Sequence, residues 1–78
     1  MTRNEFIEAI KADYNVGYRG YKMSDGTKTL IIDATTPDDR DRIISHAHTY
    51  ALHAETVQGS EWFGNRANVR CVVTGFSE

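Results

Sequence analysis

The sequence predicts an α+β fold in the order α-β-β-α-β, in which two helices pack on one face of a three-stranded sheet. Three observations lead to this fold class. A capped amphipathic segment opens the chain, an Asp-Gly pair joins two β-rich segments, and a Thr-Pro-Asp-Asp run precedes a long helical pattern. Because the chain has only 78 residues, we expect a single domain over residues 1–78 with a thin core.

The first helix is expected over residues 3–13. Thr2 and Glu5 have the spacing of a capping box, in which a hydroxyl and a carboxylate satisfy backbone N–H groups reciprocally. Apolar side chains then recur at helical intervals, as on the buried face of an amphipathic helix: Phe6, Ile7, Ile10 and Tyr14. Tyr14 and Asn15 end the pattern.

A β-hairpin is expected next. Residues 15–22 change toward a period of two, and "KTLIIDA" at 28–34 is rich in β-branched and aliphatic residues. Between them, Asp25-Gly26 is the dipeptide that favours a hairpin turn. Gly17 and Gly20 interrupt the first strand and predict a bulge or a close backbone approach.

The second helix is expected to run from residue 37 to residue 57. Thr36 suits the N-cap, Pro37 suits the first helical position, and Gly59 supplies a stop. Its apolar stripe would consist of Ile43, Ile44, Ala47, Tyr50, Ala51, Ala54 and Val57. A loop at 59–68 and a final strand at 69–76 would complete the fold.

Strand periodicity divides the sheet residues between two faces. Those expected to face the helices are Val16, Tyr18, Leu30, Ile32, Val69, Cys71 and Val73. Those expected on the open face are Arg19, Tyr21, Ile31, Arg70, Val72, Thr74 and Phe76. An open face that mixes arginines, aromatic rings and aliphatic side chains suggests a contact surface for a partner protein. Homodimerisation and ordinary exposure are the alternatives, so monomer and homodimer both remain open.

Charge and cysteine content narrow the class of protein. Nine Lys and Arg against eleven Asp and Glu give a net charge of −2, which excludes a strongly basic protein held to nucleic acid by charge alone. The one cysteine, Cys71, cannot form an internal disulfide, and a small chain without disulfides is typical of a reducing cytosol. The opening residues resemble neither a signal peptide nor a membrane span, so we expect a cytoplasmic protein.

The histidines and aspartates, which could take part in catalysis or bind a metal, do not form a recognisable catalytic or metal-binding motif. His46 and His48 lie two residues apart, which places them on different sides of a helix, and His53 lies two turns from His46. Asp33 and the acids of the helix start, Asp38, Asp39 and Asp41, could do acid–base work, but aspartates there also favour a helix N-terminus. We expect no catalytic residue, metal or cofactor. Asp38, Asp39 and Asp41 are instead candidates for contact with a basic partner.

Trp62 and Phe63 lie together in the glycine-bounded loop. Large aromatic side chains dominate many interface hot spots because each buries a rigid surface. The alternative is that one of the two folds back over the core while the other stays exposed.

The opening "NEFIEAIKADYNV" resembles that of a type II-A anti-CRISPR inhibitor from phage. Both have a short acidic amphipathic helix, an Ile-Lys near its end and an Asp-Tyr that leads into a strand. The resemblance covers about fifteen residues and ends there, since "SHAHTYALHAE" has no counterpart, and no inhibitory residue is carried over. It implies a class of small phage proteins that act in the bacterial host cell and block a nuclease complex by occupying its surface.

These observations favour a non-catalytic protein-binding inhibitor, of which an anti-CRISPR protein directed at a CRISPR-Cas effector subunit is the specific form. The partner-binding residues would be Arg19, Tyr21, Ile31, Asp38, Asp39, Asp41, Trp62, Phe63, Arg70, Val72 and Phe76. The alternative is a module that binds single-stranded nucleic acid, with bases stacked on sheet aromatics and phosphates held by Arg19, Lys22 and Arg70. The net negative charge of the chain makes this alternative the less favoured one.

Overall fold

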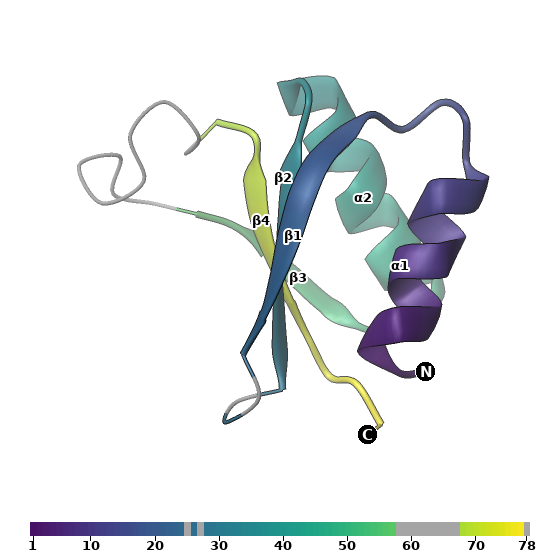
Figure 1. Ribbon diagram of the computed structural model, residues 1–78, viewed down its shortest axis with the longest axis vertical. Coiled ribbons are helices and arrows are strands. Elements are labelled where there is room, and N and C mark those ends of the chain that lie inside the picture. The colour runs from purple at the N-terminus through teal and green to yellow at the C-terminus, as the bar shows by residue number, and fades with distance from the viewer. Residues whose placement is uncertain (25, 27, 58–67, 78) are drawn as a thin grey trace.

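The computed structural model describes residues 1–24, 26, 28–57 and 68–77. Its elements, in chain order, are α1 (Arg3–Ala12), β1 (Tyr18–Ser24), β2 (Thr29–Ala34), α2 (Pro37–Thr49), β3 (His53–Thr56) and β4 (Arg70–Thr74). The fold is α+β, as predicted, with two helices and a four-stranded antiparallel sheet in the order β1-β2-β4-β3 (Figure 1).

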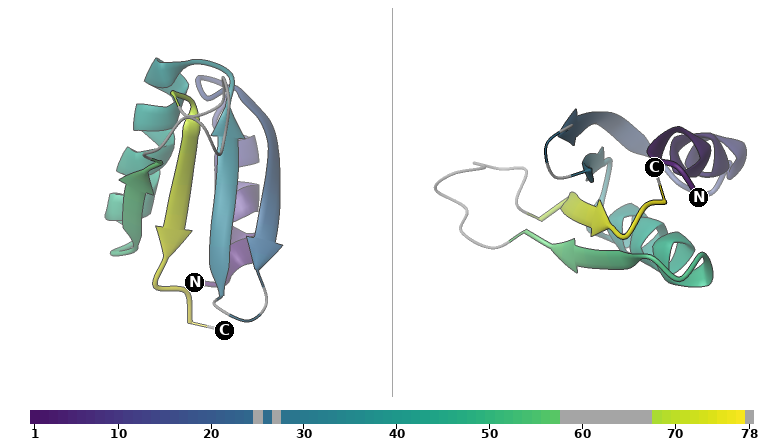
Figure 2. Two further views of the ribbon diagram at one scale, coloured as in Figure 1. Left: turned by 90° about the vertical axis from the view of Figure 1, so that its left-hand side faces the viewer. Right: turned by 90° about the horizontal axis from the view of Figure 1, so that it is seen from below.

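The two helices form one layer and the sheet forms the other. Both helices lie on the same face of the sheet, and the opposite face carries no helix, as the two further views show (Figure 2). The predicted placement of both helices on one face is therefore confirmed. Neither helix has the length and apolar character that crossing a membrane would require, a finding that covers the described residues.

The core lies between the two layers. Phe6, Ile10 and Ile43 contribute the large helix side chains, and each is at most 1% exposed. The sheet contributes four of the side chains predicted to face the helices, all fully buried: Leu30, Ile32, Cys71 and Val73. Burying an aliphatic side chain of this size contributes roughly 1.5–3 kcal/mol, so these few residues account for much of the stability of so small a domain.

The start signals of both helices were predicted correctly. Thr2 caps α1 and forms the complete capping box with Glu5, and the Thr36 hydroxyl accepts the Asp39 backbone N–H at 3.1 Å, with Pro37 in the first turn of α2. These signals are local in sequence, so they need no tertiary contact to act.

The end of α2 was predicted wrongly. The helix stops at Thr49 instead of residue 57, because Ala51 takes a left-handed conformation with φ of 60°. The Leu52 N–H then donates to the Ala47 carbonyl at 2.9 Å and the Ala51 N–H to the His48 carbonyl at 3.1 Å. This is the Schellman pattern of a helix end, and it usually has glycine where this chain has alanine.

The early stop makes room for a fourth strand, so the prediction of three strands is wrong. Residues 53–56 form β3, which pairs with β4 at the edge of the sheet. β4 in turn lies between β2 and β3, antiparallel to both. Ala54 and Val57, predicted on the helix stripe, therefore belong to β3 and to the residue after it.

The first strand begins later than predicted, at Tyr18, and the roles foreseen for Gly17, just before it, and Gly20, within it, are both present. The register shifts between Tyr18 and Gly20, which leaves Arg19 as the extra residue of a β-bulge. A Cβ atom on Gly17 would lie 2.8 Å from the Thr35 Oγ1, so Gly17 permits a close approach. Asp25 of the turn lies outside the described residues.

Candidate functional site

The open face of the sheet is the candidate site, and the strand register decides which side chains it presents. Residues directly opposite on antiparallel strands share a face. One row across all four strands consists of Lys22, Ile31, Val72 and Glu55, and a second row consists of Gly20, Asp33 and Arg70. Thr74 and His53 pair beyond the first row. Of the predicted open-face residues, Ile31, Arg70, Val72 and Thr74 are therefore placed as expected.

The centre of this face is aliphatic. Ile31 on β2 and Val72 on β4 are opposite one another, and both side chains are partly exposed. Lys22 lies beside Ile31 on the edge strand β1, and Glu55 lies beside Val72 on the edge strand β3. The row thus has an apolar middle, a cation at one end and an anion at the other.

Arg70 is bound to Asp33 within the face. The Arg70 Nη2 donates to the Asp33 Oδ2 at 2.9 Å, and the Nε donates to Oδ1, so the contact is bidentate. The side chains retain only 19% and 12% of their exposure. The hydrogen bond from Arg70 to Asp33 raises the pKa of the arginine. Arg70 is therefore neutralised within the face, whereas Arg19 and Lys22 nearby are exposed.

A depression of about 460 Å³ lies over this ion pair and extends to β1. Its lining consists of Arg19, Gly20, Tyr21, Lys22, Ile31, Asp33 and Arg70. Gly20 is opposite Asp33, and a Cβ atom on Gly20 would meet no atom within 4 Å. The missing side chain therefore leaves open space beside the buried ion pair.

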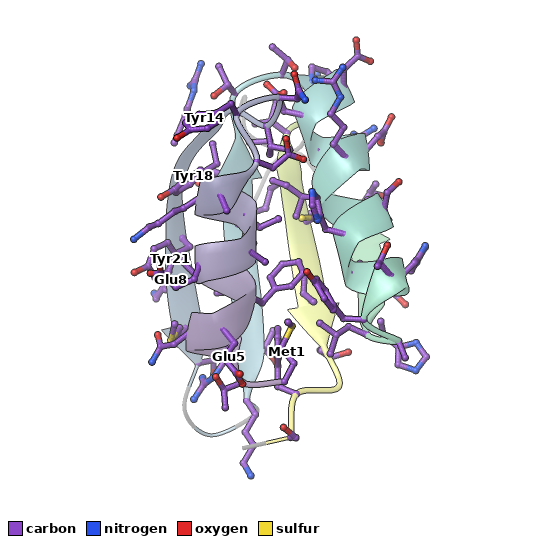
Figure 3. The ribbon with its side chains drawn as sticks, turned by 90° about the vertical axis from the view of Figure 1, so that its right-hand side faces the viewer. Met1, Glu5, Glu8, Tyr14, Tyr18 and Tyr21 are labelled. Carbon is purple, nitrogen blue, oxygen red and sulfur yellow. The ribbon has the colours of Figure 1, made fainter. Side chains whose placement is uncertain are left out.

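Tyr21 does not lie on the open face, contrary to the prediction. It pairs with Ile32, whose side chain is fully buried under the helices, so the Tyr21 side chain is directed to the helix side of the edge strand. The bulge at Arg19 causes the difference, because one extra residue reverses the face of every residue that follows. Tyr14, Tyr18 and Tyr21 follow one another along the edge formed by α1 and β1 (Figure 3).

Phe76 also departs from the prediction. It follows the end of β4, and its ring packs edge-on against Phe6 of α1 with ring centres 6.0 Å apart. It therefore extends the core instead of the open face. Trp62 and Phe63 lie outside the described residues.

The three aspartates at the start of α2 differ in their surroundings. The Asp39 side chain is only 13% exposed and bonds the Thr36 hydroxyl at 2.9 Å, and the Gly17 backbone N–H also donates to its carboxylate. These bonds hold the pKa of Asp39 below its usual range. Asp41 pairs with Arg40 at 2.9 Å, whereas Asp38 is exposed and makes no ion pair within the described residues. Asp38 and Asp41 lie at the exposed helix start, and Asp39 is engaged inside the fold.

His46, a side chain that could take part in catalysis, makes a structural hydrogen bond instead. The His46 Nε2 bonds the Asp13 Oδ2 at 2.7 Å and joins α2 to the end of α1. This pair lines a shallow hollow with Arg42, Ser45 and Thr49, but the Thr49 hydroxyl donates to the Ser45 carbonyl instead of the imidazole. A nucleophile activated by histidine needs a hydrogen bond to the ring, and neither hydroxyl of the hollow makes one.

The Cys71 thiol is fully buried in the core. Burial raises the pKa of the Cys71 thiol to about 12, which keeps it protonated at neutral pH. No group of three or more His, Cys, Asp or Glu residues within the described ranges could hold a metal ion.

Sequence reasoning identified this site only in part. It indicated Ile31, Val72 and Arg70, but it did not pair Arg70 with Asp33 or assign Gly20, Lys22 and Glu55 to the same face. Asp33 alternates with Ile31, and this alternation is the signal that could have placed it there. Glu55 had no such signal, because the second helix was predicted to extend through its strand to residue 57.

Comparison of the chain with protein-family models, with curated proteins and with solved structures found no match. The surface chemistry of the chain therefore carries the functional assignment.

Proposed function

We propose that this protein is a non-catalytic inhibitor that binds a partner protein through the open face of its sheet. The observation that carries this proposal is the partly exposed pair Ile31 and Val72 at the centre of a face that neither helix covers. Protein interfaces combine an apolar centre with a polar rim. Lys22 and Glu55 supply such a rim on the two edge strands.

The opposite charges of the two ends of the rim would also determine the orientation of the bound partner. A partner surface complementary to it would be acidic opposite Lys22 and basic opposite Glu55, because charge complementarity fixes orientation more than affinity. Asp38 and Asp41, at the start of α2, remain candidates for a separate contact with a basic region of the partner.

The proposed target is a subunit of a CRISPR-Cas effector complex in the bacterial host cell. This specific form depends on the resemblance of the N-terminal segment. Occupying a surface needs an exposed apolar patch and no reactive group, and the partly exposed pair Ile31 and Val72 supports this role.

The test uses the tagged protein in bacteria that carry an active CRISPR system. We expect recovery of an effector subunit with the protein and restored plating of a targeted phage. The Ile31→Thr/Val72→Thr double variant keeps β-branched side chains but removes the apolar patch. It should weaken the interaction about tenfold or more, the equivalent of ~1.4 kcal/mol, with little change in thermal stability.

Glu8→Gln is the matched control, since Glu8 is exposed on α1 in the helix layer. This variant should bind as the parent does. Unchanged CRISPR interference and recovery of no effector subunit would refute the CRISPR form. Full binding by the folded double variant would refute the open face as the contact surface.

Binding of single-stranded nucleic acid is the less supported alternative. The described part of the open face contains no phenylalanine, tyrosine or tryptophan on which a base could stack, and Arg70 is neutralised by Asp33. Arg19 and Lys22 would remain for phosphates. A labelled oligonucleotide that binds tightly at low salt, and loses affinity steeply as salt rises, would favour this alternative over the inhibitor.

A further inference from the structure

The outer edge of β1 is a second surface of interest. β1 is the end strand of the order β1-β2-β4-β3, so its outer backbone has no strand beside it in the described fold. It has seven residues, whereas β3 at the opposite edge has four. An edge strand presents backbone N–H and C=O groups that can accept an additional strand. The Arg3 Nη1 already donates to the Ser24 carbonyl at the end of β1 at 3.0 Å, and the six residues before Ser24 still exceed the four of β3.

The two sides of β1 carry different types of side chain. Arg19 and Lys22 are exposed and line the depression, and neither makes an ion pair within the described residues. Tyr18 and Tyr21 lie on the helix side of the same strand, where Tyr21 is 46% exposed. One side of the edge is therefore cationic and the other is aromatic.

This charge pattern discriminates between possible occupants. A second copy of β1 that paired antiparallel about its middle residue, Tyr21, would place each Lys22 opposite Gly20 and diagonal to the Lys22 of the other copy, and like charges at such cross-strand positions are destabilising. An acidic strand would instead place carboxylates beside both cations. The bulge and the two cations thus oppose self-pairing and favour a strand of opposite charge.

We infer that β1 accepts an extended acidic segment of the partner protein as a fifth strand. Its acidic side chains lie toward Arg19 and Lys22, one of them over the depression beside Gly20, and its alternate apolar side chains lie against Tyr18 and Tyr21. This inference rests on the proposed function and names the chemistry of the partner. The acidic segment is distinct from the surface that covers Ile31 and Val72.

The probe is a fluorescein-labelled peptide of eight residues that alternates Glu and Val, compared with one that alternates Lys and Val. Anisotropy measures binding, and amide hydrogen exchange by NMR locates it. We expect the acidic peptide to bind, the basic peptide to bind at least tenfold more weakly, and the backbone amides of β1 to gain protection. Raising the salt to about 1 M, where the screening length is near 3 Å, should weaken the acidic peptide. Arg19→Glu/Lys22→Glu should reverse the preference between the two peptides.

Gly20→Val provides a second variant that keeps the fold. Its side chain enters empty space, so stability should be unchanged or higher, but it fills the depression and should reduce binding of the acidic peptide. His48→Glu is the matched control, because it adds a negative charge at an exposed position of α2, the helix that packs on β2, β3 and β4.

Three results would overturn the inference: equal binding of both peptides, no binding at millimolar concentration, or protection of β3 instead of β1. Protection of β1 that depends on protein concentration without peptide would also overturn it, in favour of a second copy. All four outcomes are independent of the Ile31→Thr/Val72→Thr test, so the proposed function can stand if this inference fails.

Discussion

Replacing Gly17 and Gly20 separately by alanine tests the structure at two points of one segment. Gly17 lies where the chain approaches the start of α2. Its carbonyl accepts the Thr35 N–H at 3.0 Å, and its own N–H donates to the Asp39 carboxylate. A Cβ atom there would lie 2.8 Å from the Thr35 Oγ1, 3.0 Å from the Asp39 Oδ2 and 3.1 Å from the Thr35 Cβ. The same atom on Gly20 would contact nothing within 4 Å.

The expected magnitudes follow from these distances. Overpacking costs about 1–3 kcal/mol, and the loss of unfolded-state entropy on replacing glycine returns about 0.4–1 kcal/mol where the native conformation is compatible. Neither glycine has positive φ. Gly17→Ala should therefore lose about 1–2 kcal/mol of unfolding free energy, whereas Gly20→Ala should gain up to about 1 kcal/mol. For a chain of this size, each kcal/mol shifts the melting temperature by about 4–8 °C.

Urea unfolding and thermal melts followed by circular dichroism measure both variants. Thr35→Ala in the Gly17→Ala background should recover part of the loss, because it removes the nearest oxygen but leaves the Thr35 Cβ in place. Equal stability of Gly17→Ala and the parent would refute the close approach. A loss at Gly20 as large as that at Gly17 would refute the open space beside Asp33.

Three further predictions concern the helix end, a hydrogen-bonded carboxylate and the buried thiol. Ala51→Gly should raise the unfolding free energy by roughly 1 kcal/mol, because alanine at φ of 60° carries a steric cost that glycine avoids; a lower melting temperature would contradict the left-handed helix end. Hydrogen bonds from His46 and from the Asn15 N–H lower the pKa of Asp13 from its ordinary 3.8, so their contribution to stability is complete above about pH 4 and is lost as pH falls through the lower folded-state pKa. Asp13→Asn should accordingly flatten the dependence of stability on pH in this acidic range, and an unchanged profile would count against the Asp13–His46 bond. Cys71 should not react with a thiol reagent at pH 8 until the protein unfolds, since burial raises its pKa to about 12; rapid labelling of the native protein would show that the thiol is accessible.

Strand periodicity predicted one part of the candidate site correctly and another part wrongly. The alternation in "KTLIIDA" correctly separated Ile31 from Leu30 and Ile32, because β2 is regular and pairs on both sides. The same reasoning failed for Tyr21, since the bulge at Arg19 moves all later residues of β1 to the other face. Gly20 signalled a bulge, but the position of the extra residue depends on the pairing with β2.

The fourth strand shows a different kind of failure. The segment around Ala51 and Leu52 has good helix formers, and its first glycine is distant at position 59. The chain nevertheless leaves the helix at Ala51, where Leu52 is buried, and residues 53–56 pair with β4. Helix propensity differs by less than about 1 kcal/mol per residue among ordinary residues, so a strand partner and a buried leucine readily outweigh it.

The sequence by itself determined the α+β class, the starts of both helices and the strands that supply most of the core. Those features depend on caps, turn residues and periodicity, all of which act over a few neighbouring residues. Only the tertiary structure decided the end of α2, the fourth strand, the Asp33–Arg70 ion pair and the faces on which the cations and tyrosines of β1 lie. Each of these depends on backbone pairing between strands, where register determines which side chains meet.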